Sequence, residues 1–254
     1  MMNGGANRSG PRLPFFRRLG AHLPGPATRA HVVPFLAWMV LLTLTSRADW
    51  PRAAAYAVRT ALCLGALVYF RPWRYYTGFR PRHLVPAVAA GIGVFALWIA
   101  PEVGMGGRPS LLRELYLRFG ILPFGIPPAL LKPWPSPYDP AVCGWPLTLI
   151  RLAGSAFVIA IAEEFFWRGY LYRRLQNHDF LAVDPGRFDR ETFWLVAGLF
   201  GLEHQRYLVG AMAGAVYGYL YLRTRDIRAV CVAHATTNFL LGLYVIRTGL
   251  YVFW

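Results

Sequence analysis

Two adjacent glutamates, Glu163 and Glu164, end an uncharged run in the segment LAGSAFVIAIAEEFFWRGYLYRRL. Glu164 and Arg168 are four residues apart, so on a helix they share a face and can form an ion pair. Glu163 points about 100° away from Glu164 around a helix and has no cation at the same spacing. A carboxylate in that position suits general-base catalysis, in which it takes a proton from a reacting water. The competing interpretation is that both glutamates lie at the end of the run and are neutralised by the arginines that follow.

Two further apolar runs contain histidines at helical spacing from another residue. His204 follows Phe200 by four residues in FGLEHQ, and the neighbouring Glu203 is a candidate partner for it. A lone histidine near the end of a run more often has a structural role. His234 and Asn238 are also four residues apart, and both can donate hydrogen bonds to an oxygen held between helices. Ordinary hydrogen bonding between helices is the competing interpretation of this second pair.

The elements that must position these residues are apolar enough to lie in a membrane. Of the 254 residues, 56% are hydrophobic and only 15% charged, whereas soluble domains carry about 25% charged residues. Each crossing of the hydrocarbon core needs about 20 residues in a helix. The sequence therefore predicts an all-α, polytopic transmembrane helix bundle of about six to eight spans. Apolar runs fall at roughly 32–46, 53–70, 84–100, 145–166, 193–204, 207–222 and 229–246, and the short run at 193–204 is expected to be buried among the others.

The placement of the arginines predicts the topology. The net charge of +15 would suit a nucleic-acid binder, but the positive charges cluster between apolar runs, so no nucleic-acid partner is expected. Under the positive-inside rule, the Arg-rich loops at 71–83, 167–192 and 223–228 face the cytoplasm, together with a basic arm at 1–30. Residues 31–254 are predicted to form a single membrane domain with an external C-terminus. Arg59 and Arg151 lie near run ends, where a long side chain can snorkel to the interface.

Proline and glycine predict two local features. The segment 101–144 is too rich in proline for one regular helix, so a loop with a short interfacial helix at about 110–119 is expected. Gly210, Gly214 and Gly218 repeat every four residues and predict the close approach of another helix.

Taken together, these residues resemble the motifs of the CPBP family, which comprises CAAX proteases and bacteriocin-processing enzymes. The family's motifs are E-E-x-x-x-R, F-x-x-x-H and H-x-x-x-N/D, in that order on successive helices. Each motif alone is weak, but three in order inside apolar runs are specific. The resemblance covers residues 145–246, and the first three runs match only as generic membrane helices. The matching residues here are Glu163-Glu164 with Arg168, Phe200 with His204, and His234 with Asn238.

This resemblance implies an intramembrane endopeptidase with a defined set of catalytic residues. Glu163 and His204 would activate a water that attacks the scissile carbonyl. His234 and Asn238 would stabilise the oxyanion, a contribution often worth about 2.7–4 kcal/mol for each donor.

The resemblance also implies supporting residues, and it raises the question of a metal ion. Glu164 and Arg168 would support the catalytic groups. Family members are also described as metalloproteases, in which case Glu163, His204 and His234 would hold Zn²⁺. We favour a reaction without a metal or other cofactor, because the sequence has no HExxH or comparable ligand helix.

Substrate and location are predicted only by class. The implied partners are the lipid bilayer and a membrane-anchored or lipid-modified protein substrate, and the implied location is the plasma membrane, as a bacterial inner-membrane protein. The C-terminal stretch also looks like a bacterial branch associated with sorting of proteins that bear a C-terminal membrane tail. Glu203, where the family commonly has a small residue, departs from the pattern. The competing function is a non-enzymatic membrane protein, either an immunity factor or a proton-relay or transport protein.

Overall fold

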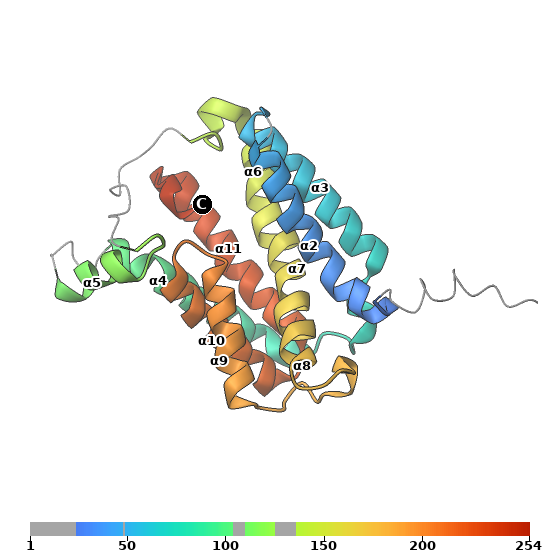
Figure 1. The fold of residues 1–254 in the computed structure, drawn as a ribbon. Coiled ribbons are helices and arrows are strands. Elements are labelled where there is room, and N and C mark those ends of the chain that lie inside the picture. The colour runs from blue at the N-terminus through green and yellow to red at the C-terminus, as the bar shows by residue number, and fades with distance from the viewer. Residues whose placement is uncertain (1–23, 48, 104–109, 125–135) are drawn as a thin grey trace, which may run out of the picture.

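Every regular element formed by the described residues is a helix, which confirms the predicted all-α class. The structure is a computed structural model and describes residues 24–47, 49–103, 110–124 and 136–254. In Figure 1, α11 (Ile227–Thr248) crosses the middle of the bundle. On one side of it lie α2 (Pro26–Arg47), α3 (Arg52–Phe70) and the long helix that contains α6–α8; on the other lie α4 (Leu84–Val103), α9 (Arg190–Leu202) and α10 (Tyr207–Thr224).

All the predicted apolar runs appear as helices, but fewer of them than predicted meet the length and hydropathy of a span. Within the described residues, five helical segments are long and apolar enough to cross a membrane: α2, α3, α4, α11 and the continuous stretch Pro140–Arg174. The predicted run at 193–204 is α9, whose 13 residues reach only about 20 Å. α9 and α10 therefore form a helical hairpin beside the five longer helices, where the sequence suggested up to eight spans. α2 begins at Pro26, inside the range assigned to the basic arm, and residues 1–23 of that arm lie outside the described residues.

The long central helix changes its hydrogen-bonding pattern around the glutamates. It begins with α6 (Pro140–Gly154), which Asp139 caps and which is broken near its start by Gly144 at φ +80°. Two π-helical segments, η3 (Ser155–Ile159) and η4 (Phe165–Leu171), then enclose the single α-helical stretch α7 (Ala160–Glu164), before α8 (Tyr172–Arg174) ends the helix. π-Segments of this kind are frequent at functional sites, because they free backbone carbonyls and rotate side chains.

The glycine repeat packs α10 against α9, as predicted. A Cβ added at Gly214 would lie 3.0 Å from the carbonyl oxygen of Ala197, and one at Gly218 would lie 2.9 Å from the Phe193 ring. On the α9 side, a Cβ at Gly201 would lie 2.6 Å from the carbonyl oxygen of Tyr207. The hairpin can therefore form only because these positions lack side chains.

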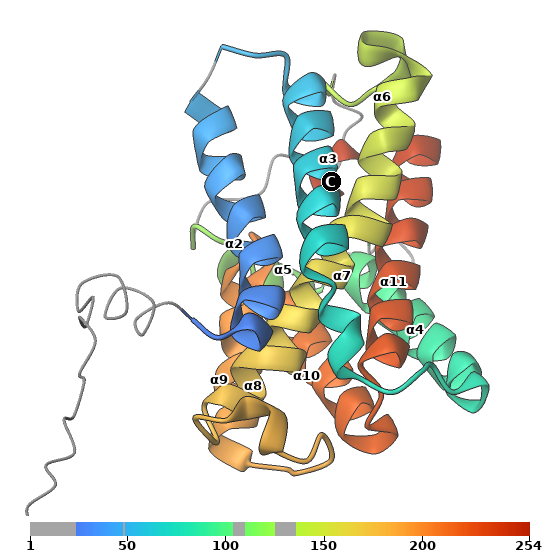
Figure 2. The same ribbon diagram turned by 90° about the vertical axis from the view of Figure 1, so that its right-hand side faces the viewer.

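The Arg-rich loops meet at one end of the bundle, the lower end in Figures 1 and 2. His83 Nδ1 lies 3.1 Å from Asp226 Oδ2, and Arg228 donates to the carbonyl oxygen of Trp73 at 3.3 Å. Arg225 lies 3.6 Å from Asp184, so all the predicted cytoplasmic loops are joined there. This end also carries the short helices η1 (Pro72–Tyr75), η2 (Pro81–His83) and η5 (Phe180–Ala182).

A buried ion pair ties together elements that are far apart in the sequence. Arg206, between α9 and α10, donates to both carboxylate oxygens of Glu102 in α4, with 2.8 Å from Nη2 to Oε2. The same guanidinium donates to the carbonyl oxygen of Val252 at 2.7 Å, in the C-terminal η6 (Tyr251–Phe253). Nearby, the predicted interfacial helix is present as α5 (Leu111–Phe119), capped by Ser110.

Candidate active site

A cavity of about 360 Å³ lies between the helices and is lined by Glu163, His204, His234 and Asn238. These are the four predicted catalytic residues, and they come from α7, the turn after α9, and α11. The volume falls within the range of about 300–1,000 Å³ that is usual for ligand pockets. The structure thus brings all four predicted residues to one polar cavity.

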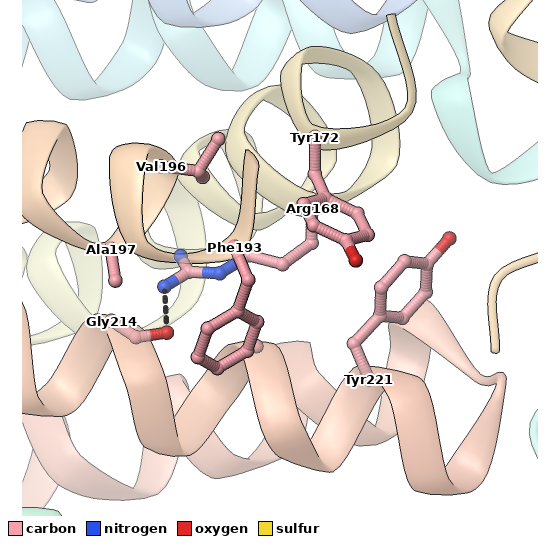
Figure 3. A pocket seen from close by; sticks show the side chains of 8 residues that line it. Arg168, Tyr172, Phe193, Val196, Ala197, Gly214 and Tyr221 are labelled. Atoms are coloured by element: carbon pink, nitrogen blue, oxygen red, sulfur yellow. Dashed lines mark hydrogen bonds between the residues drawn. The ribbon is translucent and has the colours of Figure 1, made fainter. Parts of the chain in front are cut away.

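Glu164 and Arg168 lie behind the cavity wall. Arg168 Nη1 donates to Glu164 Oε1 at 3.0 Å, which is the predicted i,i+4 pair. Arg168 Nη2 donates to the carbonyl oxygen of Gly214 at 3.0 Å, the bond drawn in Figure 3. The guanidinium carbon also lies 4.3 Å from the centre of the Phe200 ring. With side-chain exposures of 2% for Arg168 and 0% for Glu164, this is a sealed pair that locks the central helix to α10.

The space around Arg168 is nearly filled. Figure 3 shows its side chain passing between α9 residues and Tyr221 to reach Gly214. The remaining void measures about 10 Å³, roughly the size of one water-sized probe. The pair therefore has a structural environment and is separated from the larger cavity.

His234 lies between the two glutamates. Its Nδ1 is 2.8 Å from Glu164 Oε1, and its Nε2 is 3.7 Å from Glu163 Oε2. The imidazole stacks on the Tyr217 ring, with ring centres 4.9 Å apart and planes 27° apart. Because Glu164 accepts a hydrogen bond from Nδ1, it fixes the orientation of the ring and directs Nε2 toward Glu163. The spacing of residues in the sequence did not predict the contacts of His234 with the two glutamates.

His204 is held in a similar way. Its Nδ1 donates to the carbonyl oxygen of Phe200 at 2.9 Å, and Nε2 has no hydrogen-bond partner among the described residues. The Trp98 ring packs edge-on against the imidazole at 5.3 Å. The suggestion that Glu203 partners His204 is wrong, because Glu203 Oε2 accepts a hydrogen bond from Trp167 Nε1 at 3.0 Å. His204 reaches the cavity because α9 is short and ends at Leu202, which places the histidine in the turn within the bundle.

Asn238 contacts the π-segment η3 across the cavity. Its Nδ2 donates to the carbonyl oxygen of Ser155 at 2.9 Å, which fixes the plane of the amide. An amide nitrogen carries two hydrogens, so one remains for a ligand. At the position before Asn238, Thr237 accepts a hydrogen bond from Tyr217 and donates to the carbonyl oxygen of Gly91 at 2.8 Å. Tyr217 and Thr237 line the same cavity, and sequence reasoning missed both.

Two arginines also line the cavity. The positions of Arg59 and Arg151 near run ends suggested that they can snorkel to the membrane interface, but the whole Arg59 residue is only 6% exposed. Arg59 lies in the second turn of α3, and its side chain turns inward over the rings of Trp38 and Tyr56. The snorkelling interpretation is therefore wrong for Arg59, and Arg151 faces the same cavity.

The described residues contain no group of three or more His, Cys, Asp or Glu side chains arranged to hold a metal ion. Glu164, the carboxylate nearest to His234, is already engaged by Arg168. Glu163, His204 and His234 thus line one cavity, but the described residues do not arrange them as a set of metal ligands.

A family comparison can now be set beside this geometry. Residues 145–240 match the family model described as type II CAAX prenyl endopeptidase Rce1-like. The match supports the resemblance of residues 145–246 to the CPBP family of CAAX proteases. The match includes every predicted catalytic residue and both supporting residues, and it excludes α2, α3 and α4. No curated protein and no solved structure matches the chain.

The match is to a family of CAAX-type proteases, so it supports protease activity at the level of the family. The apolar helices of the chain agree with an integral membrane location, and the family match suggests a protein substrate.

Proposed function

We propose that this protein is a CAAX-type intramembrane endopeptidase that hydrolyses a peptide bond of a membrane-anchored or lipid-modified protein. The observation that carries the proposal is the convergence of Glu163, His204, His234 and Asn238 on one cavity of about 360 Å³. A peptide segment that enters this cavity meets a carboxylate, two imidazoles and an amide, which are the groups that acyl transfer to water requires.

Glu163 and His204 activate the water in this proposal. Glu163 Oε2 has no hydrogen-bond partner among the described residues, and neither has His204 Nε2, whose ring is fixed by the bond to Phe200. A water held between them loses a proton to Glu163 while its oxygen bonds to the scissile carbonyl carbon. The same proton then passes from Glu163 to the departing amine nitrogen as the carbon–nitrogen bond breaks.

His234 and Asn238 stabilise the oxyanion. Asn238 has one amide hydrogen left after bonding Ser155. Glu164 holds the His234 ring through Nδ1, and Nε2 is the ring nitrogen that faces the cavity side of Glu163 and is available to the oxygen that becomes negative. The sealed Glu164–Arg168 pair positions His234 and does not touch the reacting atoms.

The test starts with the substrate. Membranes of a strain that carries Glu163→Gln should accumulate an uncleaved precursor, seen by comparative proteomics, because only the proton acceptor is lost. The purified precursor should then be cut by the unmutated protein and by Glu114→Gln, an exposed glutamate of α5 that serves as the control, but not by Glu163→Gln. Wild-type turnover by a folded Glu163→Gln protein would contradict the assignment of the base.

We also propose that the reaction needs no metal. This rests on the donor arrangement, in which Arg168 and His234 already engage Glu164. Purified protein should then contain no stoichiometric zinc, and chelators should leave cleavage unchanged. Elemental analysis that finds one zinc per chain, lost in His204→Ala, would make the histidines metal ligands.

For the orientation, we propose that the Arg-rich end of the bundle faces the cytoplasm of a bacterial cell, which places the N-terminus inside. The support is the collection of the three Arg-rich loops at one end. A periplasm-dependent reporter should be active when fused after Trp254 and inactive when fused before Met1, and the reverse pattern would invert the topology. The assignment to a bacterial branch that sorts proteins with C-terminal tails remains a prediction.

A further inference from the structure

Arg59 and Arg151 meet over a shared aromatic ring inside the catalytic cavity. Their guanidinium carbons lie 5.3 Å and 4.3 Å from the centre of the Tyr56 ring. Arg59 also lies 5.2 Å from the Trp38 ring, and Arg151 lies 5.3 Å from the Trp254 ring. The two cations therefore line the same cavity as Glu163.

Neither arginine has an acidic partner in the part of the chain that the structure describes. The ion pairs found there involve other residues, and the Nε atoms of Arg59 and Arg151 are buried without a hydrogen-bond partner. The other deeply buried arginines differ. Arg168 and Arg206 each pair with a glutamate, and Arg173 donates to backbone carbonyls at 2.8–3.1 Å. Two cations that line one cavity without acidic partners repel each other, and they lose part of their hydration, which a bound anion would offset.

We propose that Arg59 and Arg151 form an anion-binding subsite of the catalytic cavity, and that its ligand is a carboxylate carried by the peptide substrate. This inference rests on the proposed function, because the subsite shares its cavity with the catalytic residues. Aromatic rings cover the faces of the guanidiniums, so binding must use their N–H edges, which match the two oxygens of a carboxylate. The carboxylate would anchor the peptide and hold the scissile bond near Glu163.

The cavity favours a peptide over a phospholipid as the source of the anion. Its volume of about 360 Å³ is at the small end for ligand pockets, and the catalytic residues occupy part of its wall. A phospholipid phosphate would bring two acyl chains with it, whereas a peptide brings a carboxylate on a single narrow chain. Cation–π packing without any ligand is the purely structural alternative.

Binding of two probes that differ in one group tests the proposal. Dansyl-Leu-Leu-Phe with a free carboxylate and the same peptide with a C-terminal amide are titrated by fluorescence anisotropy into the full chain in phosphatidylcholine nanodiscs at pH 7.5. The chain carries Glu163→Gln, so that no probe is cleaved. We expect the acid to bind about 10–100-fold more tightly than the amide, as for hydrogen bonds to a charged group. This comparison needs no arginine variant and is independent of any folding defect.

Arginine variants then locate the effect. Arg59→Gln and Arg151→Gln should each reduce the binding of the acid toward that of the amide, and Arg59→Lys should retain part of the preference because it keeps the charge. Arg52→Gln, an exposed arginine seven residues earlier on the same helix, should bind like the parent chain. Equal binding of acid and amide to the parent chain, or a preference that survives both glutamine variants, overturns the proposal.

The same titration separates the other outcomes. In one outcome, the parent chain loses its preference for the acid in phosphatidylglycerol nanodiscs, and the Arg59→Gln variant binds the acid with the same affinity in both lipids. The subsite then takes lipid phosphate, and the peptide assignment is wrong. A preference retained in both lipids supports a peptide carboxylate. Because binding is measured without turnover, Arg-dependent binding together with no cleavage of any membrane precursor by the unmutated chain would contradict the proposed function alone. Cleavage by the unmutated chain, together with equal binding of the acid and the amide, would contradict the subsite alone.

Discussion

The two sides of the catalytic cavity differ in how their buried charges are compensated. On the side of α7, η4 and α11, Glu164 Oε1 accepts from Arg168 at 3.0 Å and lies 2.8 Å from His234 Nδ1. On the side of α3 and α6, Arg59 and Arg151 contact aromatic rings and have no carboxylate partner among the described residues. We call the first side closed because Glu164, Arg168 and His234 bond to one another, although Glu163 Oε2 and Glu164 Oε2 have no hydrogen-bond partner among the described residues. We call the second side open because neither arginine has an acidic partner there.

This difference separates two tasks within one cavity. The bonds among Glu164, Arg168 and His234 hold these side chains in a single geometry, which suits groups that must be oriented before the reaction. Donors without partners are costly in the folded protein, and that cost is recovered only when a ligand binds. The closed side therefore orients the chemistry, and the open side is suited to recognition.

The largest expected effect comes from breaking the closed side. Arg168→Ala leaves Glu164 as a buried carboxylate without its cation and removes the hydrogen bond to Gly214. Loss of one partner of a buried pair typically costs about 3–5 kcal/mol of stability. Thermal or denaturant unfolding in detergent should show a loss of that size, while Arg223→Ala, at an exposed position of α10, should change little. A loss below about 1 kcal/mol for Arg168→Ala would mean that the network is not closed.

The next effect concerns turnover and distinguishes an oxyanion site from a proton relay. Asn238→Ala and His234→Ala should each lower turnover by a factor of about 10²–10³ with little change in substrate binding. A proton relay between His234 and the glutamates would instead need His234 and tolerate loss of Asn238, since an amide does not titrate. Thr236→Ala, which removes a hydroxyl that bonds only within its own helix, is the matched control and should retain activity. Full activity of Asn238→Ala on the native substrate would favour the relay.

Local spacing accounts for what the sequence predicted correctly. The Glu164–Arg168 pair and the glycine repeat of α10 depend on positions four residues apart, which a helix brings together whatever surrounds it. The apolar runs likewise predicted every long helix, because lipid contact requires continuous apolar sequence. The motifs of residues 145–246 further predicted which polar groups would share a cavity.

Contacts between distant segments account for what the sequence did not predict. His234 and Glu164 are 70 residues apart, and Arg206 and Glu102 are 104 residues apart, so no periodicity links them. The π-segments on either side of α7 arise from tertiary packing and have no residue signature here. For Arg59, the position near a run end fits both an outward and an inward side chain. Tyr56 was a signal for the inward side chain. An aromatic residue three or four positions before an arginine on a helix can pack its ring against the guanidinium.

The smallest expected effect on stability is that of Arg59→Gln, and it is tested against Arg206→Gln, a variant of an equally buried arginine. Arg59 and Arg206 are both 6% exposed, but Arg206 is paired with Glu102 and Arg59 has no acidic partner among the described residues. Arg206→Gln should cost about 3–5 kcal/mol, because Glu102 loses its buried cation. Arg59→Gln removes cation–π contacts worth about 2 kcal/mol when desolvated, but it also removes an uncompensated buried charge, so its stability should stay within about 1 kcal/mol of the parent. Unfolding of both variants in the same detergent measures the contrast directly. An equal loss for the two variants would show that Arg59 is already satisfied in the folded chain, and the distinction between a closed and an open side of the cavity would disappear.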